Sequence, residues 1–332
     1  MPGVVHNPKL SRDVLTIDPA AVSAAIEEAI RNEVRGFRRR GAVVGVSGGV
    51  DSAVVAALCA RALGAGRVVA ILMPERDSSP ESTLLGEQLA SHLGIAHLVE
   101  DITPALEAVG CYQRQVDAIR QAIPEYGEGW RSKITLPSLA DEERLNVSQL
   151  TAEDPAGRQT KVRLSAAAYL QLVAATNFKQ RVRKMMEYHH ADRLNYVVAG
   201  TPNRLEYDQG FFVKQGDAAA DLKPIAHLYK TQVYALAAYL GVPERIRSRT
   251  PTTDTFSLPQ TQEEFYFTLP YDEMDLCLYG LNHGVPVVEV AAVLGRSEEQ
   301  VARVYRDIER KRRATRYLHA SPRLVQTVPE ID

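Results

Sequence analysis

The segment GVSGGVDS, residues 45–52, joins an apolar run to the start of a helical pattern. The run at 43–46 is rich in valine, as a buried strand is, and an Ala/Leu-rich helical pattern begins at Ala53. Glycines, serines and an aspartate stand between them. Free backbone N–H groups and the helix dipole converge where a strand turns into a helix, so this turn predicts an anion-binding site.

Two common phosphate-binding motifs do not describe this turn. It lacks the lysine of Gly-x-x-x-x-Gly-Lys-Ser/Thr, and it is not the Gly-x-Gly-x-x-Gly of dinucleotide-binding folds. Ser47 and Ser52 can donate to phosphate oxygens, while Gly48 and Gly49 allow close backbone approach. Asp51 would repel a phosphate unless a cation lay between them, which makes it a candidate Mg²⁺ ligand.

Strand and helix patterns alternate on both sides of this turn. We predict, in chain order, a helix from Asp18-Pro19 to Gly41, a strand at 43–46, a helix at 53–63, strands at 68–72 and 96–99 separated by a helix at 80–93, a long helix at about 164–190, a strand at 196–199 and helices at 230–240 and about 297–316. This alternation indicates an α/β fold, a doubly wound parallel sheet flanked by helices.

A second polar turn follows the strand predicted at 196–199. That strand ends in Gly200-Thr201, and Glu206 lies five residues further on. Parallel sheets bind ligands at the carboxyl ends of their strands, so the turns at 47–52 and 200–206 should border one crevice. Glu206 alone reads most simply as a solvated acid at a helix start, and only its pairing with Asp51 favours a shared metal ion.

We expect a single domain over residues 1–332 with two less regular parts. The segment at about 111–163 is rich in proline, glycine and charge, and it predicts an insertion with a few short helices or a flap. The segment 243–332 predicts short helices and loops.

Composition narrows the class of protein further. Hydrophobic residues make up 45% and charged residues 24%, and the formal net charge of −2 gives no support for a nucleic-acid partner. The three cysteines, Cys59, Cys111 and Cys277, form no ligand-spaced pair, which favours a reducing compartment. We find neither a signal-peptide layout nor an apolar run of the roughly 18 residues that span a membrane. The sequence therefore predicts a cytoplasmic protein without a membrane partner.

The turn SGGVDS at 47–52 resembles the signature of the N-type ATP pyrophosphatases, or PP-loop enzymes, which have an adenine nucleotide alpha hydrolase-like fold. The resemblance implies cleavage of ATP between its α and β phosphates to adenylate an acceptor. It also implies ATP contacts along Gly45, Val46, Ser47, Gly48, Gly49, Val50, Asp51 and Ser52. Several kinds of synthetase share this signature, so it leaves the acceptor open.

The second half of the chain is similar to one branch of these enzymes. The segment AGTPNRLEYDQGFFVKQGDAAADLKPIAHLYKTQVYALAAYLGVP at 199–243, with TPTTD at 250–254, resembles the core of NAD synthetases. The resemblance covers about 40–110 and 164–315. It implies that Thr201, Lys230 and Thr252 contact ATP, that Asp51 and Glu206 bind Mg²⁺, and that Asp51 and Lys230 are catalytic.

The same resemblance implies a set of substrate contacts. These are Arg181 on the long helix, Lys214 and Asp221 in FFVKQGDAAAD, and Arg310 and Lys311 in ERKR. The family has a histidine where this chain has Arg310, so the local contacts should differ there. We assign Phe211 and Phe212 mostly to the core, and Arg183 and Lys184 could equally form an exposed basic face.

The implied reaction is that of a ligase which forms a C–N bond. Mg·ATP would adenylate the nicotinate carboxylate of deamido-NAD⁺ and release pyrophosphate, and ammonia would then displace AMP to give NAD⁺. About 40 residues precede the first predicted strand, too few for the glutaminase domain of glutamine-dependent synthetases. We therefore expect free ammonia, or ammonia from a separate glutaminase, as the nitrogen source. The resemblance also implies a homodimer.

Two other functions stay open at this point. The ATP chemistry could serve another carboxylate, an alternative that the 111–163 segment and Arg310 motivate. A non-catalytic nucleotide sensor is the other alternative, and it is disfavoured because Asp51, Glu206 and Lys230 are all present.

Overall fold

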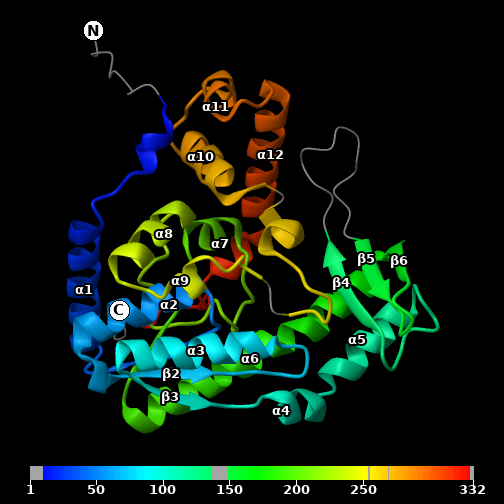
Figure 1. Ribbon diagram of the computed structural model, residues 1–332, viewed down its shortest axis with the longest axis horizontal. Coiled ribbons are helices and arrows are strands. Elements are labelled where there is room, and N and C mark those ends of the chain that lie inside the picture. Colours follow the sequence, from blue (N-terminus) through cyan, green and yellow to red (C-terminus); the bar gives the residue numbers. More distant parts are fainter. Residues whose placement is uncertain (1–9, 136–148, 253–254, 268, 330–332) are drawn as a thin grey trace.

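The computed structural model describes residues 10–135, 149–252, 255–267 and 269–329, and it centres on a parallel sheet of four strands (Figure 1). The strand order is β3-β2-β1-β7. The strands are β1 (Ala42–Gly45), β2 (Val68–Leu72), β3 (Ala96–Val99) and β7 (Val197–Ala199), and each neighbouring pair is parallel. These four strands confirm the predicted α/β class.

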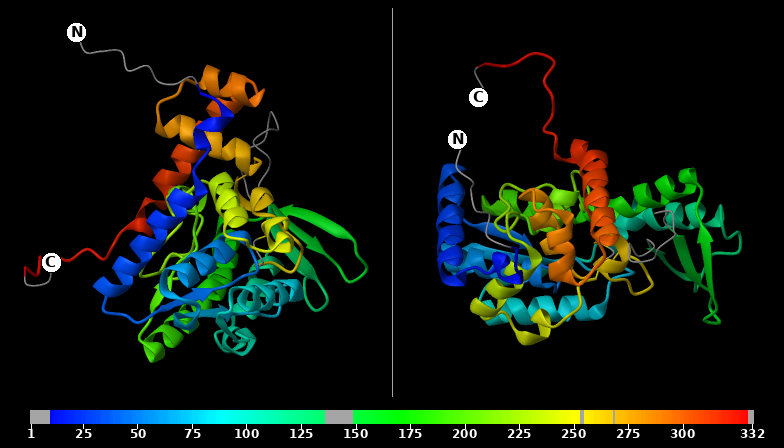
Figure 2. Two further views of the ribbon diagram at one scale, coloured as in Figure 1. Left: turned by 60° about the vertical axis from the view of Figure 1, so that its left-hand side comes forward. Right: turned by 90° about the horizontal axis from the view of Figure 1, so that it is seen from above.

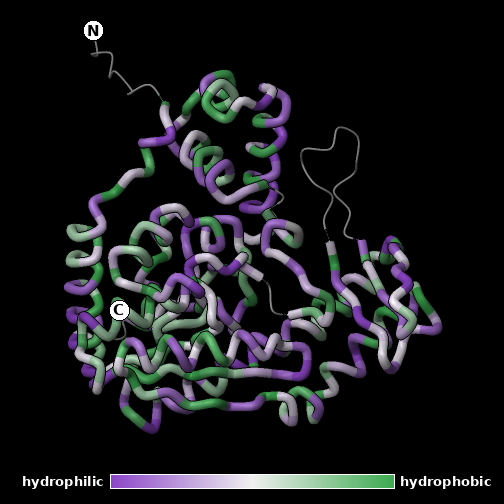
Figure 3. Tube along the Cα trace, in the orientation of Figure 1, coloured by the Kyte–Doolittle hydropathy of each residue, from purple (hydrophilic) through white to green (hydrophobic). Residues whose placement is uncertain are grey.

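Helices cover both faces of the sheet. Side chains of a strand alternate between the two faces, and in β1 both sets are apolar and need to be covered. Ala42 and Val44 of β1 belong to one buried apolar cluster, whereas Val43 belongs to another. The first cluster includes residues of α1 (Pro19–Gly36), α2 (Val50–Leu63), α3 (Pro80–Leu93) and α8 (Lys230–Tyr239). The second includes residues of α4 (Thr103–Ala108), α5 (Cys111–Arg120) and α6 (Ala166–Leu194). Figure 3 shows green and purple alternating along the outer helices, as expected of amphipathic helices that cover a core.

The first helix begins where the sequence predicts and ends earlier. The Asp18 side chain accepts hydrogen bonds from the backbone N–H groups of Ala20 and Ala21, which caps the start of α1. The prediction that this helix runs to Gly41 is wrong, because α1 ends at Gly36. Arg38 adopts a φ of 54°, and this left-handed residue turns the chain toward β1.

The segment predicted as short helices or a flap contains a small antiparallel sheet, which the sequence analysis misses. After α5 come β4 (Arg131–Thr135), β5 (Gln149–Glu153) and β6 (Gln159–Arg163), in the order β4-β5-β6. Ile134 and Leu150 join an apolar cluster that also includes residues of α5 and α6. One face of this sheet is therefore buried, and β6 at its edge is largely exposed.

The C-terminal part of the chain is helical, and it has an apolar cluster of its own. Its helices are α9 (Glu244–Arg247), α10 (Tyr271–Asn282), α11 (Val287–Leu294) and α12 (Glu298–Thr315), and a short π-helical turn spans Glu263–Phe267. Three further short turns, η1 (Arg12–Leu15), η2 (Ala65–Arg67) and η4 (Arg316–His319), and α7 (Arg204–Gln209) complete the described elements. Beyond η4 the chain leaves the body of the molecule (Figure 2).

The three cysteines are free and buried. Within the described ranges no helix has the length and apolar character needed to cross a membrane.

Candidate active site

The turn between β1 and α2 is shaped by its own serine. Gly49 caps α2, and the Ser52 hydroxyl donates to the Gly49 carbonyl oxygen at 3.0 Å. The Ser52 oxygen in turn accepts from the backbone N–H of Ser47 at 3.3 Å. Ser52 is buried, whereas Ser47 is exposed toward the cavity. The loop is thus held in a fixed shape that leaves the Ser47 hydroxyl at the surface of the cavity.

Asp51 and Glu206 come together, as the sequence predicts, and a buried lysine lies beside them. The Lys230 side chain is fully buried and its Nζ donates to Asp51 Oδ2. Burial and, second, the charge of Asp51 raise the pKa of Glu206 to about 8. Burial works against the charge of Lys230, yet Asp51 and Glu206 leave its pKa raised. The group therefore has two carboxylates and one ammonium in a space shielded from water.

Asn203, which the sequence analysis does not single out, links the two carboxylates. Its Nδ2 donates to Asp51 Oδ1 at 3.0 Å, and its backbone N–H donates to Glu206 Oε2 at 3.0 Å. The Asn203 side-chain oxygen also accepts from the backbone N–H of Glu206, which completes a capping box at the start of α7. An Asn three residues before a Glu at a helix start is a sequence signal for this box, and it could have been found.

Gln262 fixes the other oxygen of Glu206. Its Nε2 donates to Glu206 Oε1 at 3.3 Å, while the Tyr271 hydroxyl donates to Gln262 Oε1 at 2.7 Å. Gln262 lies 56 positions after Glu206, so no local pattern announces the contact. Both carboxylate oxygens of Glu206 are thereby oriented by neutral donors.

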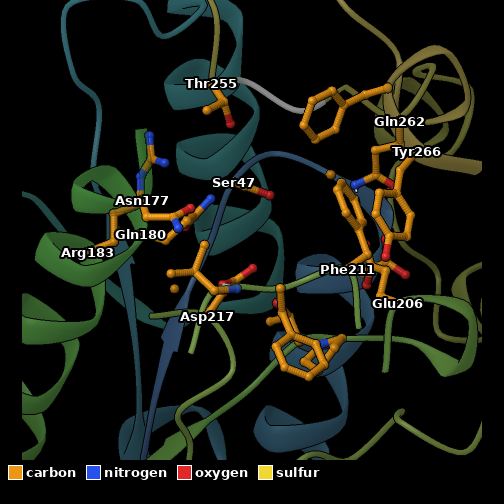
Figure 4. Close-up of a pocket in the computed structure, with 18 of the residues that line it drawn as sticks. Ser47, Asn177, Gln180, Arg183, Glu206, Phe211, Asp217, Thr255, Gln262 and Tyr266 are labelled. Atoms are coloured by element: carbon orange, nitrogen blue, oxygen red, sulfur yellow. Dashed lines mark hydrogen bonds between the residues drawn. The ribbon is translucent and has the colours of Figure 1, made fainter. Parts of the chain in front are cut away.

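The turn, Asp51, Glu206 and Gln262 line one large cavity of about 660 Å³. Figure 4 shows Phe211, Tyr266, Gln262 and Glu206 on one wall and the α6 residues Asn177, Gln180 and Arg183 on the opposite wall, with Ser47 between them. The residues expected from the sequence that line it are Gly45, Val46, Ser47, Gly49, Val50, Asp51, Ser52, Arg181, Thr201, Glu206, Lys214 and Thr252. The predicted crevice at the carboxyl ends of β1 and β7 is thus present.

Five other expected residues do not line this cavity. Gly48 is buried behind the turn, and Lys230 lies behind Asp51. Asp221 accepts from the backbone N–H of Val198 at 2.7 Å, beside the edge strand β7. Arg310 and Lys311 lie on α12, outside the lining.

Lys311 has a structural set of partners. Its Nζ forms an ion pair with Asp307 Oδ2 at 2.8 Å and donates to the Tyr266 carbonyl oxygen at 2.7 Å. Burial lowers the pKa of Lys311. Because Tyr266 lines the cavity, Lys311 supports the cavity wall from behind. Arg310 is 56% exposed and pairs with Asp307.

Aromatic side chains lie beside Glu206 on the same wall of the cavity (Figure 4), and they correct one expectation in part. Phe211 and Phe212, which we assign mostly to the core from the sequence, both line the cavity, and Phe211 also packs against the C-terminal apolar cluster. The rings of Phe211 and Tyr266 are stacked, with centroids 4.7 Å apart and planes inclined by 24°. Gly210, with a φ of +73°, ends α7 and turns the chain so that the two phenylalanines face the cavity. Such a wall suits a planar ring.

A buried ion pair occupies the α6 side of the cavity. Lys184 Nζ lies 2.6 Å from Glu187 Oε2, and both side chains are buried. The reading of Lys184 as part of an exposed basic face is therefore wrong, although Arg183 beside it does line the cavity. Asp217 lies in the same cavity, and burial raises its pKa.

The small antiparallel sheet also reaches the cavity. Ile134 of β4 is one of the lining residues. Strand β4 contacts the segment after Thr255: the Leu258 N–H donates to the Ser132 carbonyl oxygen at 3.2 Å, and the Ser132 N–H donates to the Ser257 hydroxyl at 2.9 Å. The segment at 111–163 therefore contributes directly to the site.

A phosphate turn and two facing carboxylates at the carboxyl edge of an open parallel sheet define an α/β nucleotide-binding protein of the PP-loop kind. The family model described as NAD synthase matches residues 22–124 and 138–316, so the chain belongs to the NAD synthase family. Strand β4 falls between the two matched segments.

Named relatives and solved structures agree with this family. The chain is 60% identical over 318 residues to the NH(3)-dependent NAD(+) synthetase of Mesorhizobium japonicum, which covers 96% of this chain and 100% of the relative. It is 58% identical over 322 residues to the NH(3)-dependent NAD(+) synthetase of Rhizobium meliloti, and the match covers 97% of this chain and 96% of the relative. The fold is similar to that of NH3-dependent NAD synthetase from Campylobacter jejuni, with a TM-score of 0.61 at 22% identity over 93% of this chain and 100% of that one. The fold is also similar to that of NMN synthetase from Francisella tularensis, with a TM-score of 0.64 at 22% identity, and this match covers 94% of this chain and 100% of that one.

Proposed function

We propose that this chain is an ammonia-dependent NAD⁺ synthetase that amidates the nicotinate carboxylate of deamido-NAD⁺. As a member of the NAD synthase family it is a ligase that forms a C–N bond, with ATP as co-substrate. The observation that carries the proposal is one cavity that combines the phosphate turn, the Asp51–Glu206 pair and a stacked aromatic wall. The names of the rhizobial relatives support deamido-NAD⁺ and ammonia as the substrates.

The donor set fits a magnesium ion. Asp51 and Glu206 are oxygen donors in a shielded site, and the charge of Asp51 contributes to the raised pKa of Glu206, so a divalent cation would relieve their repulsion. No third carboxylate, histidine or cysteine joins them within the part of the chain that the structure describes. Asp51 and Glu206 would hold the ion, and phosphate oxygens would supply further ligands. Bound there, Mg²⁺ would neutralise charge on the triphosphate.

The chain's own groups then position the reacting atoms. The exposed Ser47 hydroxyl and the Gly49 region face the phosphates, and Thr201 and Thr252 are the proposed further contacts with ATP. Arg181 and Lys214 line the same cavity and are the proposed contacts with the dinucleotide. For Asp221, Arg310 and Lys311, the roles that the family resemblance implies stay predictions.

The chemistry has two steps. An oxygen of the nicotinate carboxylate attacks the α-phosphorus of ATP, and the bond to the β-phosphate breaks, which gives an acyl-adenylate and pyrophosphate. Ammonia then adds to the activated carbonyl carbon, loses a proton, and AMP leaves with the electron pair of the broken C–O bond. Such a reaction needs positioning and charge neutralisation more than a nucleophilic side chain. A separate glutaminase, a homodimer and a cytoplasmic location stay predictions.

The test is a balanced assay of the intact chain. With Mg·ATP, deamido-NAD⁺ and ammonium, we expect one AMP, one pyrophosphate and one NAD⁺ per turnover. Replacing deamido-NAD⁺ with nicotinate mononucleotide tests the acceptor, because that molecule carries the same carboxylate without the adenylyl half. Activity on another carboxylate in place of deamido-NAD⁺ would keep the ATP chemistry and overturn the assigned acceptor.

A glycine substitution tests the shape of the phosphate turn. Gly48 has a φ of +73°, and a Cβ there would lie 2.6 Å from the Ser82 carbonyl oxygen. Gly48→Ala should therefore combine backbone strain of about 1–2 kcal/mol with a displaced turn. We expect the KM for ATP to rise at least on the order of tenfold, since donors around a bound phosphate tolerate little displacement.

Gly94→Ala is the matched control for this prediction. Gly94 has a φ of +67°, and no atom lies within 4 Å of its would-be Cβ. It should lower the melting temperature and leave the KM for ATP unchanged. Equal KM values for the two variants would show that the turn is not shaped for phosphate.

A further inference from the structure

One arginine touches the phosphate turn from a distant part of the chain. Arg249, just after α9, lines the cavity, and its Nη1 lies 3.5 Å from the Gly48 carbonyl oxygen. Its Nη2 donates to the Ser82 hydroxyl at 3.0 Å. The guanidinium therefore spans the gap between the turn and the start of α3.

The other cations that line the cavity are engaged elsewhere. Lys184 pairs with Glu187, and Lys214 donates to the carbonyl oxygens of Tyr317 and Ala320. Arg181 and Arg183 each donate to a backbone carbonyl oxygen, those of Lys214 and Met73. Lys230, which does not line the cavity, is buried behind Asp51.

Arg249 differs from them in its place, because its guanidinium contacts the phosphate turn itself. Among the residues that the structure describes, no carboxylate oxygen lies within ion-pair distance of its guanidinium, and both its contacts are neutral oxygens. A guanidinium with two neutral partners at a phosphate-binding turn retains its full charge for an anion. It also offers the fork of donors that matches phosphate oxygens.

We propose that Arg249 is a catalytic residue that binds the pyrophosphate end of ATP and stabilises it as it leaves. This inference rests on the proposed function. When the acceptor carboxylate attacks the α-phosphorus, the bond from that phosphorus to the bridging oxygen breaks, and the oxygen keeps the electron pair. The negative charge that develops on the departing pyrophosphate lies at the phosphate turn, where Arg249 donates.

The segment that carries Arg249 is fixed at several points beyond it, which favours preorganisation. Lys179 Nζ, held by Glu75 and Asp77, donates to the Thr255 carbonyl oxygen at 2.8 Å. Strand β4 pairs with the backbone at Leu258. Gln262 then ends the segment on Glu206. The described residues that follow Arg249, from Thr255 to Gln262, are thus anchored to α6, to β4 and to Glu206.

The experiment measures adenylation alone, as ATP–pyrophosphate exchange with deamido-NAD⁺ and without ammonia. For Arg249→Ala we expect kcat/KM for ATP to fall on the order of 10²-fold, the cost of removing one transition-state donor. The inhibition constant of added pyrophosphate should rise at least on the order of tenfold. Arg249→Lys should partly restore kcat/KM for ATP and the inhibition constant of pyrophosphate. In both variants the KM for deamido-NAD⁺ should change little.

Two controls separate this role from a structural one. Arg245→Ala removes a nearby arginine that pairs with Glu81 at the surface, and it should leave both values unchanged. Ser82→Ala removes the hydrogen bond that holds Arg249 but keeps its charge, and it should cost far less than Arg249→Ala. Equal losses in Ser82→Ala and Arg249→Ala, or an unchanged inhibition constant in Arg249→Ala, would overturn the proposal. Failure of the proposed function would appear separately, as wild-type protein without exchange on deamido-NAD⁺.

Discussion

Asp51→Asn should abolish turnover while the protein stays folded. Asp51 is partly buried and lines the cavity at the start of α2, and it is one of the two carboxylates proposed to hold Mg²⁺. A metal ion supplies several kcal/mol of charge stabilisation in such reactions, so we expect the rate to fall at least on the order of 10³-fold. The measurement is NAD⁺ formation under saturating Mg·ATP, deamido-NAD⁺ and ammonium.

The charges around Asp51 explain why the fold should survive this change. The charge of Asp51 contributes to the raised pKa of Glu206, so its removal makes Glu206 easier to ionise beside Lys230. An asparagine can still accept from Asn203, and Lys230 keeps Glu206 as a neighbouring charge. Thermal unfolding should therefore show a small shift.

The control for Asp51→Asn is Asp18→Asn. That residue caps α1 with its side chain, and asparagine caps a helix as well, so activity and stability should both be retained. Near-normal Mg²⁺-dependent turnover in Asp51→Asn would show that Asp51 is not a metal ligand.

Lys230→Met should produce the largest loss of stability. The lysine is fully buried, and its removal leaves Asp51 and Glu206 facing each other without a cation. Breaking a buried ion pair in this way costs about 3–5 kcal/mol. The melting temperature should accordingly fall by roughly 10 °C. Mg²⁺ should raise the melting temperature of this variant more than that of the wild type, because the ion replaces the lost positive charge.

Lys311→Met tests whether that recovery is specific. Lys311 is also buried and paired, with Asp307, but it lies outside the cavity. This variant should lose stability by a similar mechanism and gain no additional shift from Mg²⁺. A metal response that is the same in both variants, or absent from Lys230→Met, would contradict the proposed metal site.

The central sheet could be predicted from the sequence because its strands are buried on both faces. Val43, Ile71 and Val198 face one layer of helices, and Val44 and Ala70 face the other, so β1, β2 and β7 are continuous apolar runs, whereas the edge strand β3 is largely exposed. The end of α1 could not be predicted with equal success. Its stop depends on the left-handed Arg38, and arginine carries no such signal.

The small sheet escaped prediction for a different reason. The strand β6, QTKVR, is almost entirely polar, β4 buries only alternate side chains, and β5 includes polar residues among its buried ones. Proline, glycine and charge around them resemble a loop. What holds these strands is their packing against α5 and α6 and the pairing of β4 with the backbone near Leu258. Contacts of that kind have no local sequence pattern.

The candidate site divides in the same way. The turn at 47–52 and Glu206 could be found from the sequence, because both follow strands that end at one edge of the sheet. Gln262 and Arg249 could not, since they reach the site only after folding brings the segment beyond α9 over the cavity. The assignment of Phe211 and Phe212 mostly to the core rests on aromatic residues usually being buried; Phe211 does pack against the C-terminal cluster, but the turn at Gly210 also brings both rings to the cavity.

Synthesis of this chain on the ribosome must reach residue 197 before β1 gains its second neighbour, because β1 lies between β2 and β7. Until then a nascent chain presents an unpaired, apolar strand edge, a template for aggregation. The long loop that this parallel pairing closes also slows folding. Asp51 is synthesised before β7, whereas Glu206 and Lys230 are synthesised after it. A chain truncated within α6 would therefore be prone to aggregation, and it would lack Glu206 and Lys230 of the site.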